Sequence, residues 1–257
     1  MNRHERLTTL LDMLAEREGL DVDDVAAELG VSATTIRRDL DHLAEQQLLT
    51  RTHGGAVAND LAYDLPLRFR SARHAPEKQR ISTAAAELVS SGAVVGLNGG
   101  TTTAGVARAL AVRSDLTGAA GLTVVTNALN IANELAVRPN MKIVMTGGVA
   151  RQSFELSGPL AGLVLENLSI DVVFLGVDAL HPVDGAFAHH EGEAAVNRLM
   201  ADRAERVVAV ADSSKLGGRA FARICPIDRI HEVVTDTDAD PEVVRTLEAH
   251  GIGVHRA

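Results

Sequence analysis

Apolar side chains in the first sixty residues recur at helical spacing in three short stretches. The first stretch places four leucines at i, i+3, i+4 and i+7: Leu7, Leu10, Leu11 and Leu14. This spacing predicts an amphipathic helix, and Gly19 is expected to end it. Asp21 is well placed to cap a second helix, whose apolar positions are Val25, Ala26 and Leu29.

A third helix is predicted after a sharp turn. Gly30 permits the turn, and Ser32 is placed to cap the helix that follows. Its inward positions, again at helical spacing, are Ile36, Leu40 and Leu43. The opposite face is polar and carries Thr34, Thr35, Arg37, Arg38 and His42. Residues 50–57 are short and turn-rich, which suits a small β-wing. Residues 1–58 are therefore expected to form a winged helix-turn-helix domain.

The pattern changes after an expected linker at residues 59–75. Short β-branched runs then alternate with amphipathic stretches up to the C-terminus. The predicted strands are 93–97, 123–126, 142–146, 171–177, 207–211 and 232–235. The predicted helices are 77–90, 103–112, 128–137, 159–168, 193–204 and 241–250. This alternation is typical of an α/β domain with a mostly parallel sheet and helices on both faces, and we expect it to span residues 76–257.

Composition narrows the class of protein. Hydrophobic residues make up 46% of the 257 residues and charged residues 23%, which is ordinary for a globular protein with a core. No apolar run is long enough to cross a membrane, and the N-terminal stretch lacks the features of a secretory signal. The single Cys225 cannot form an intrachain disulfide. We therefore expect a cytoplasmic protein with no membrane contact.

Net charge gives little support to nucleic-acid binding at first sight. The chain carries a net charge of −9, and its first sixty residues contain six Lys and Arg against twelve Asp and Glu. Any DNA contact must then come from a local cluster rather than from a general basic field.

The polar face of the third predicted helix supplies such a cluster. Ser32, Thr34 and Thr35 can bond phosphates or base edges from the helix N-terminus, which also favours anions. Arg37 or Arg38 can reach a guanine edge or a phosphate. Asp39 would either orient one of these arginines or exclude wrong sequences. The alternative is a three-helix bundle whose arginines are merely solvated.

A second constellation follows the first predicted strand of the α/β region. Asn98, Gly99, Gly100, Thr101 and Thr102 form a glycine–threonine loop that leads into a helix. Glycines let the backbone approach a ligand closely, and hydroxyls and free N–H groups at a helix start can cradle a phosphate. The loop matches neither a Walker A loop nor the dinucleotide fingerprint, so nucleotide hydrolysis is disfavoured.

Polar residues after other predicted strands are expected to join this loop. They are Asn127, Gly147, Gly148, Asp178 and Lys215. In open α/β sheets, ligands bind outside the carboxyl ends of the strands, so these residues should converge on one crevice. Lys215 is one of three lysines against 22 arginines, which suggests a specific role for its compact ammonium, although a plain surface lysine is the alternative.

The ordered motifs of the N-terminal region resemble a known family. The string Thr-Ile-Arg-Arg-Asp-Leu at 35–40 and the His-Gly-Gly-Ala wing at 53–56 resemble the N-terminal domain of DeoR-type bacterial transcription regulators, over residues 3–57. The resemblance implies that the third helix is the recognition helix. It also implies that the wing, with Arg51 and His53, touches the DNA backbone.

The C-terminal region resembles the sensor domain of the same family over residues 76–236. The matching strings are 100–102, 125–127, 146–148, 174–176, 212–215 and 235–236. The resemblance implies a fold similar to ribose-phosphate isomerases and a phosphorylated sugar-pathway metabolite as effector. The sequence departs from the family at Asn98, where Asp is common, and through residues 177–190, so the sugar end of the pocket is expected to differ.

Two alternative hypotheses remain open, a metal site and an enzymatic function. His181, Asp184, His189, His190 and Glu191 suggest a metal site, but their spacing matches no metal motif, and a polar loop near the ligand mouth explains them more simply. A sugar-phosphate isomerase with an accessory domain is the other reading. It is disfavoured because Asp178 alone is kept of the three carboxylates in the isomerase string.

Our hypothesis is therefore a transcription regulator rather than an enzyme. We expect a repressor that binds a double-stranded DNA operator and responds to a small phosphorylated metabolite. We also expect a homodimer or homotetramer, because symmetric oligomers read repeated half-sites. No cofactor, metal or catalytic residue is expected.

Overall fold

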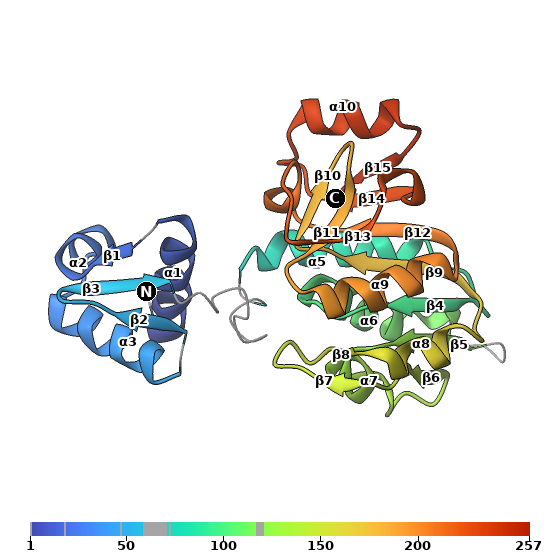
Figure 1. Cartoon of the computed structure of the whole chain (residues 1–257), viewed down its shortest axis with the longest axis horizontal. Coiled ribbons are helices and arrows are strands. Elements are labelled where there is room, and N and C mark those ends of the chain that lie inside the picture. Colours follow the sequence, from blue (N-terminus) through green and yellow to red (C-terminus); the bar gives the residue numbers. More distant parts are fainter. Residues whose placement is uncertain (1, 18, 47, 59–70, 72, 117–120) are drawn as a thin grey trace. The chain divides into compact units, whose positions relative to one another are not determined.

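The computed structural model describes residues 2–17, 19–46, 48–58, 71, 73–116 and 121–257. These residues form two compact units, Met1–Arg73 and His74–Ala257, and each is described by itself (Figure 1). The expected linker, residues 59–75, lies largely outside the described residues.

The N-terminal unit contains the three helices that the periodicity predicts. They are α1 (Arg3–Glu16), α2 (Val22–Leu29) and α3 (Ala33–Glu45). Both predicted N-caps are present, because the Asp21 carboxylate accepts hydrogen bonds from two amides of α2 and Ser32 Oγ accepts one from the Thr35 amide. Gly30 lies between α2 and α3 with φ of 65°, a conformation that glycine adopts without steric penalty. The predicted inward side chains of α3 are all fully buried: Ile36, Leu40 and Leu43.

Asp39 has a different role from either one expected. Its side chain is buried, and its carboxylate accepts a hydrogen bond from Arg6 Nε on α1 at 2.5 Å. Arg3 Nε lies 3.6 Å from the same carboxylate. The physical reason lies in the spacing: Asp39 is three residues after Ile36 and four before Leu43, which places it on the inner face of α3. It fixes α3 against α1, and its ion-pair partners in the described part of the chain are Arg3 and Arg6 on α1.

A three-stranded antiparallel sheet completes the N-terminal unit. Its strands are β1 (Gly19–Asp21), β2 (Leu49–Arg51) and β3 (Gly55–Ala58), in the order β1-β3-β2. The β2–β3 hairpin confirms the predicted wing. The expected end of the first helix at Gly19 is wrong, because α1 ends at Glu16 and Gly19 begins β1. Leu20 pairs with Ala56, so this strand depends on a partner far along the chain.

The C-terminal unit is built on seven parallel strands in the order β15-β14-β12-β9-β4-β5-β6 (Figure 1). The strands are β4 (Val94–Leu97), β5 (Leu122–Thr126), β6 (Met141–Met145), β9 (Ile170–Gly176), β12 (Ala204–Val210), β14 (Glu232–Thr235) and β15 (Gly253–Arg256). All six predicted strands are present, and β15 was not predicted. As an edge strand of four residues with only Val254 packed on the core, β15 lacks a hydrophobic run.

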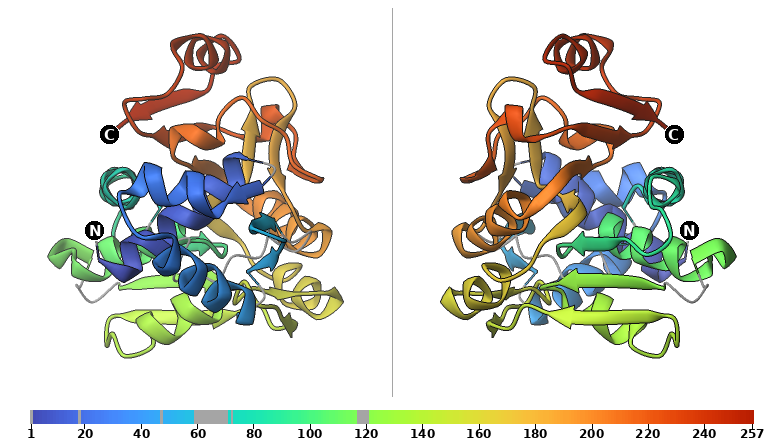
Figure 2. Two further views of the ribbon diagram at one scale, coloured as in Figure 1. Left: turned by 90° about the vertical axis from the view of Figure 1, so that its left-hand side faces the viewer. Right: turned by 90° about the vertical axis from the view of Figure 1, so that its right-hand side faces the viewer.

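Helices cover both faces of this sheet, which confirms the predicted α/β class (Figure 2). On one face lie α5 (Ala75–Glu87), α6 (Thr101–Val112) and α7 (Leu129–Leu135). On the other lie α8 (Pro159–Leu165), α9 (Glu191–Asp202) and α10 (Pro241–Ala249). Side chains of β9 alternate between the two layers, with Val172 and Phe174 packing on one and Val173 and Leu175 on the other. This double burial explains why the strands read as continuous apolar runs.

The segment expected as a polar loop around His181 and His189 is instead part of a second small sheet. Strands β10 (Ala179–His181), β11 (Gly185–Ala188) and β13 (Ala222–Cys225) pair antiparallel in the order β10-β11-β13. A further pair joins β7 (Val149–Ala150) to β8 (Leu156–Ser157). Strands of two to four residues are too short to show an alternation, so the sequence pattern did not reveal them.

The described helices and the single cysteine can be compared with what the composition led us to expect. None of the described helices has the length and apolar character that crossing a membrane requires. Cys225, on β13, is 1% exposed, and burial raises the pKa of its thiol to about 11, so the thiol is neutral near pH 7.

Asn98 ties together the carboxyl ends of β4 and β9. Its Nδ2 donates to the Gly176 carbonyl at 2.9 Å, and its Oδ1 accepts from the Gly176 amide at 2.8 Å. The side chain is 1% exposed, so this pair of hydrogen bonds is shielded from water. An aspartate, which is common at this position in the resembling family, could not donate to the carbonyl when ionised.

We predict that Asp39→Ala destabilises the N-terminal unit by about 2 kcal/mol, because it leaves the largely buried Arg6 guanidinium without its carboxylate. Amide hydrogen exchange should show faster exchange in α1 and α3. Asp41→Ala is the control, since Asp41 pairs with Arg51 at the surface and its loss should cost less than about 0.5 kcal/mol. Equal effects of the two substitutions would contradict the role given to Asp39.

We predict that Asn98→Asp lowers the melting temperature at pH 7 and that the deficit shrinks as the pH falls. Burial beside the Gly176 carbonyl should raise the pKa of the new carboxyl, and the protonated form can donate to that carbonyl. A group with a raised native pKa stabilises the fold below its unfolded pKa and loses that contribution as the pH rises through the native pKa. Melting curves between pH 4.5 and 8 measure this.

Asn167→Asp is the matched control for Asn98→Asp. Asn167 Nδ2 also donates to a carbonyl, that of Leu163 at 2.9 Å, but at an exposed position. If the loss of melting temperature in Asn98→Asp does not depend on pH, or if Asn167→Asp responds equally, then loss of the buried Asn98 donor does not cause the destabilisation.

Candidate DNA-binding surface and effector site

The polar face of α3 is exposed, as predicted. Thr34, Arg37 and Arg38 are exposed, while Ile36 and Leu40 between and beyond them are fully buried. Ser32 Oγ accepts the Thr35 amide at 3.2 Å and lies 2.9 Å from Thr35 Oγ1. These two hydroxyls therefore first organise the helix start. The amides at the first positions of a helix have no partner within the helix, so this end can receive a phosphate.

The two arginines of α3 differ in their surroundings. An Arg37 guanidinium nitrogen lies 3.8 Å from a carboxylate oxygen of Asp23 on α2, and both side chains are more than half exposed. A pair of this kind contributes little and can open at low cost. Arg38 is exposed, and its side chain has no hydrogen bond or ion pair within the described part of the chain. Both guanidinium groups are thus available to an incoming anion.

Arg51 connects the wing to α3 through a surface ion pair. Arg51 Nε lies 2.9 Å from Asp41 Oδ1 on α3, and its guanidinium also donates to the Gly55 carbonyl at the start of β3. Arg51 is partly buried, whereas His53 is exposed in the turn between β2 and β3. The structure thus gives Arg51 a structural role in addition to the predicted DNA contact, and leaves His53 at the tip.

The candidate effector residues follow strands that all end at one edge of the large sheet. The chain runs outward from β4 through β5 to β6, and then returns to place β9 on the opposite side of β4. The strand order therefore reverses between β4 and β9. At such a switch point the connections leave in opposite directions and open a crevice beyond the carboxyl ends.

Helix α6 begins at this switch point. Its N-cap, Gly100, offers no capping side chain, so the amides of the first turn are left for another acceptor. Thr103 Oγ1 donates back to the Gly100 carbonyl at 3.2 Å. Thr102 is buried, and its carbonyl accepts a hydrogen bond from Ser82 Oγ on α5 at 3.0 Å. Thr101 is half-buried, so its hydroxyl and the open amides are the groups best placed to meet a phosphate.

Glu155 is a buried carboxylate at this edge that sequence reasoning missed. It is 4% exposed, and its Oε2 accepts a hydrogen bond from Asn127 Nδ2 at 3.1 Å. Its side chain packs against Gly99, since a Cβ there would lie 2.1 Å from Glu155 Cγ. Nothing in the local pattern signals this burial, because residues 147–158 show neither helical nor strand periodicity. Glu155 reaches Gly99 in the loop after β4 only because the chain turns back after β6 through the β7–β8 hairpin.

The turn at Gly147 and Gly148 brings about that return. It leads β6 into the β7–β8 hairpin, and the Leu156 amide then donates to the Asn127 carbonyl at 2.7 Å. Asn127 is fully buried, and its Nδ2 also approaches the Leu156 carbonyl at 3.3 Å. The structure therefore brings Asn127 together with the loop after β4 through Glu155.

Asp178 and Lys215 lie at the same edge but belong to neighbouring strands. Asp178 Oδ2 accepts the His189 amide at 2.8 Å, which holds the β10–β11 hairpin in place. Lys215 lies in a 3-10 turn after β12, and its ammonium has no ion pair among the residues described. Strand β9 lies between β12, which Lys215 follows, and β4, which the glycine–threonine loop follows.

Hydrogen bonds to Asp236 support the Lys215 turn. Asp236 Oδ2 accepts the Ser213 amide at 2.7 Å, and Oδ1 accepts the Asp238 amide at 2.9 Å. Burial alone would raise the pKa of Asp236, but these hydrogen bonds outweigh it and hold the pKa below its usual value. The carboxylate thus stays ionised and fixes the turn that carries Lys215.

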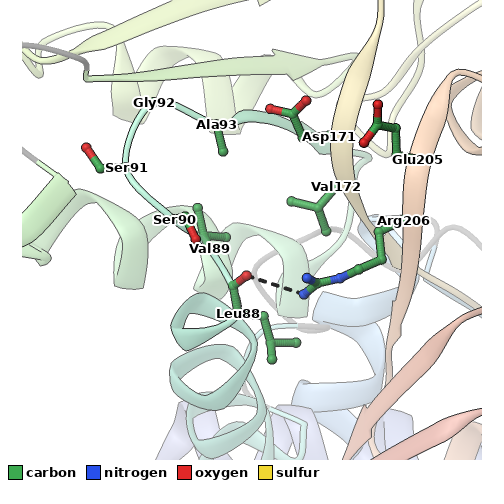
Figure 3. A pocket seen from close by; sticks show the side chains of 10 residues that line it. All are labelled: Leu88, Val89, Ser90, Ser91, Gly92, Ala93, Asp171, Val172, Glu205 and Arg206. Atoms are coloured by element: carbon green, nitrogen blue, oxygen red, sulfur yellow. Dashed lines mark hydrogen bonds between the residues drawn. The ribbon is translucent and has the colours of Figure 1, made fainter.

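A cavity of about 550 Å³ lies at the opposite, amino-terminal edge of the same sheet (Figure 3). Two of its charged lining residues, Asp171 and Arg206, support the fold. Asp171 accepts the Val94 amide at 2.7 Å, and the Arg206 guanidinium lies 2.9 Å from Glu232 and donates to the Leu88 carbonyl. Because these groups are already engaged and lie away from the strand-end loops, the cavity does not coincide with the candidate effector site.

The histidine-containing segment has structural partners. His181 Nδ1 lies 3.1 Å from Asp184 Oδ2, Arg219 also pairs with Asp184, and His190 Nδ1 accepts the Gly192 amide at the start of α9. Across the described ranges, no three His, Cys, Asp or Glu side chains are grouped so that they could hold a metal ion.

Comparison with known families gives two matches along this chain. A DeoR-like helix-turn-helix domain matches residues 6–61, and the DeoR C-terminal sensor domain matches residues 73–237. Among relatives, a putative aga operon transcriptional repressor of Escherichia coli O157:H7 is 34% identical and aligns over 97% of this chain and 92% of its own length. The glycerol-3-phosphate regulon repressor of E. coli K12 is 31% identical over 98% of both chains.

Similar solved structures show more distant likeness. Ribose 5-phosphate isomerase A of Methanocaldococcus jannaschii has a TM-score of 0.42 and 21% identity over 56% of this chain and 55% of its own. The full-length sorbitol operon regulator SorC of Klebsiella pneumoniae has a TM-score of 0.39 and 12% identity over 87% of this chain and 97% of its own.

The family models together cover most of the chain, and the relatives named above are transcriptional regulators rather than isomerases. This agrees with the regulator hypothesis and not with the enzyme alternative. The chain therefore belongs to the DeoR family and is a DNA-binding transcriptional regulator.

Proposed function

We propose that this regulator is a repressor of genes for sugar or related carbon metabolism, and that a phosphorylated sugar releases it from DNA. The observation that supports this most directly is the open start of α6 at the β4–β9 switch point, where a phosphate can be received. The named repressors of the aga operon and of the glycerol-3-phosphate regulon support the same class of target. No cofactor takes part in this mechanism.

The proposed DNA contacts come from α3 and the wing. They are Ser32, Thr34, Thr35, Arg37, Arg38, Arg51 and His53. In this proposal α3 enters the major groove, its start receives a phosphate and an arginine reads a guanine edge. The wing contacts the neighbouring backbone. The domain limits that go with it are residues 1–58 for DNA and 76–257 for the effector, joined through 59–75.

The proposed effector contacts lie around the carboxyl edge of the sheet. They are Asn98, Gly99, Gly100, Thr101, Thr102, Asn127, Gly147, Gly148, Asp178 and Lys215. The α6 amides and Thr101 hold the phosphate, and Lys215 approaches from beyond β9. Asn98 contributes chiefly by holding the two strand ends together.

The functional form in this proposal is a homodimer or homotetramer that acts in the cytoplasm on a repeated or palindromic operator. One winged domain reads few base pairs, and two-fold symmetry in the protein is matched by two-fold symmetry in the site. Effector binding then favours one arrangement of the DNA-binding units over another, which changes operator affinity.

We predict that Arg37→Ala or Arg38→Ala weakens specific binding to the upstream region of the protein's own gene by about 10-fold to 100-fold, since each removes one charged contact to a base edge or a phosphate. Fluorescence anisotropy at several salt concentrations measures both affinity and salt slope. Loss of a phosphate contact should lower the slope by about 1, whereas loss of a base contact should mainly relax specificity.

Arg245→Ala is the control for these arginine variants, because Arg245 is exposed on α10 of the sensor domain. All variants should keep the wild-type melting curve. Wild-type affinity in both α3 variants, at all salt concentrations, would refute the proposed recognition helix.

We predict that Lys215→Ala leaves operator affinity unchanged and weakens the binding of sugar phosphates and inorganic phosphate by about tenfold, because one cationic partner of the anion is lost. Isothermal titration calorimetry on the whole chain measures the binding directly. Lys142→Ala is the matched control, since Lys142 is an exposed lysine on the edge strand β6. Equal phosphate affinity of Lys215→Ala and wild type would remove Lys215 from the site.

A further inference from the structure

Exposed apolar side chains are concentrated on one segment of the C-terminal unit. Nine large apolar side chains are exposed in the described part of the chain, and four of them fall within residues 149–163: Val149, Phe154, Leu160 and Leu163. A fifth, Leu129, begins α7, where its amide donates to the Phe154 carbonyl at 2.9 Å. Single exposed apolar residues are ordinary on a protein surface, whereas a group of them marks an interaction site.

Helix α8 has no polar outer face. Its seven residues, Pro159–Leu165, are all apolar or glycine. Ala161 and Leu165 are fully buried in the core, whereas Leu160 and Leu163 are 56% and 64% exposed. These two leucines are three residues apart and therefore share one face of the helix. A helix that is apolar all round is normally buried on all sides, so we expect the outer face of α8 to be covered in the functional form.

The β7–β8 hairpin leads directly into α8 and extends its apolar surface (Figure 1). Val149 pairs with Ser157, two residues before α8, and is 70% exposed. Phe154 follows the hairpin turn with φ of 67°, a left-handed conformation that bulky residues rarely adopt, and its side chain is 46% exposed. Backbone strain of this kind is concentrated at functional sites. We call Val149, Phe154, Leu160 and Leu163 the α8 patch.

The segment that carries the α8 patch presents no exposed charged side chain. Residues 147–165 include two charged residues: Glu155 is buried, and Arg151 is half-buried and pairs with Glu193 at 3.3 Å. DNA or an anionic membrane would be attracted by exposed cations, which this segment does not offer. The whole chain carries a net charge of −9, so two copies repel each other and approach most easily through a face without exposed charge.

We infer that the α8 patch is the apolar core of a two-fold interface between two copies of this chain. A two-fold interface places the same surface on both sides, which an uncharged apolar patch allows without electrostatic conflict. Interface cores are depleted of charged residues in the same way. The inference rests on the homodimer or homotetramer of the proposed function and deepens it, because it assigns the surface that joins two subunits.

Sedimentation velocity of the purified whole chain, from nanomolar to micromolar concentration, tests the inference. Leu163→Glu places a charge on both sides of the apolar core, so self-association should weaken by at least about tenfold and the assembly should fall to half its size. Val112→Glu is the matched control, because Val112 is 75% exposed at the end of α6 and gains the same charge outside the α8 patch. It should associate like the wild type.

Phe154→Gly separates association from folding. Glycine adopts the left-handed conformation at this position without steric penalty, so the variant should fold with the circular dichroism spectrum of the wild type. Loss of the exposed ring should nevertheless weaken self-association by about tenfold. This variant keeps the test decisive even if Leu163→Glu does not fold.

The outcomes distinguish the inference from the proposed function. If the wild-type chain is an oligomer and folded Phe154→Gly or Leu163→Glu associates as tightly as it does, two copies meet elsewhere, and the inference is wrong while the proposed homo-oligomer stands. If the wild-type chain stays monomeric over the whole concentration range, the inference and the proposed homo-oligomer both fail. The proposed DNA and effector contacts are tested separately by the arginine and Lys215 variants.

Discussion

The parallel pairing of β4 with β9 is the contact on which the sensor domain depends. It joins two halves of the sheet that the chain builds in opposite directions, and it creates the switch point beyond which the α6 start opens. The side chain of Asn98 extends this pairing beyond the paired residues of the strands, because it bonds to both the amide and the carbonyl of Gly176. The loop after β4 is thus positioned by buried hydrogen bonds rather than by its own short sequence.

Both units of the molecule present the N-terminus of a helix as a candidate anion-binding site. In α3 and in α6, a polar loop leads into a helix whose first amides have no partner within the regular helix, and nearby hydroxyls belong to Ser32 and Thr35 or to Thr101. The difference lies in the surroundings. The start of α3 is exposed and flanked by guanidinium groups, which suits the phosphates of a long polymer. The start of α6 is partly buried, with Thr102 and Thr103 shielded from solvent, which suits a small molecule rather than a polymer.

The elements with strong periodicity could be predicted from the sequence, and the site only in part. Helices α1 to α3, the N-caps of α2 and α3 and six strands of the large sheet follow from local spacing and from cap chemistry. Asp39 was misread because its neighbours in the string are exposed arginines, although its spacing from Ile36 places it inside. Glu155 could not be predicted at all, because its burial depends on a hairpin of two-residue strands that returns to the end of β5. The pairing of β1 with β3 also required contacts distant in sequence.

An effector can release this regulator only by binding one arrangement of the DNA-binding units more tightly than another. A difference of 100-fold in effector affinity between the two arrangements corresponds to about 2.7 kcal/mol, within the usual range of allosteric coupling. By linkage, operator DNA must then weaken effector binding by the same factor. The fully buried Asn127 Oδ1, which has no hydrogen-bond partner among the described residues, offers a physical source for such a difference, because a ligand hydroxyl would supply the missing donor.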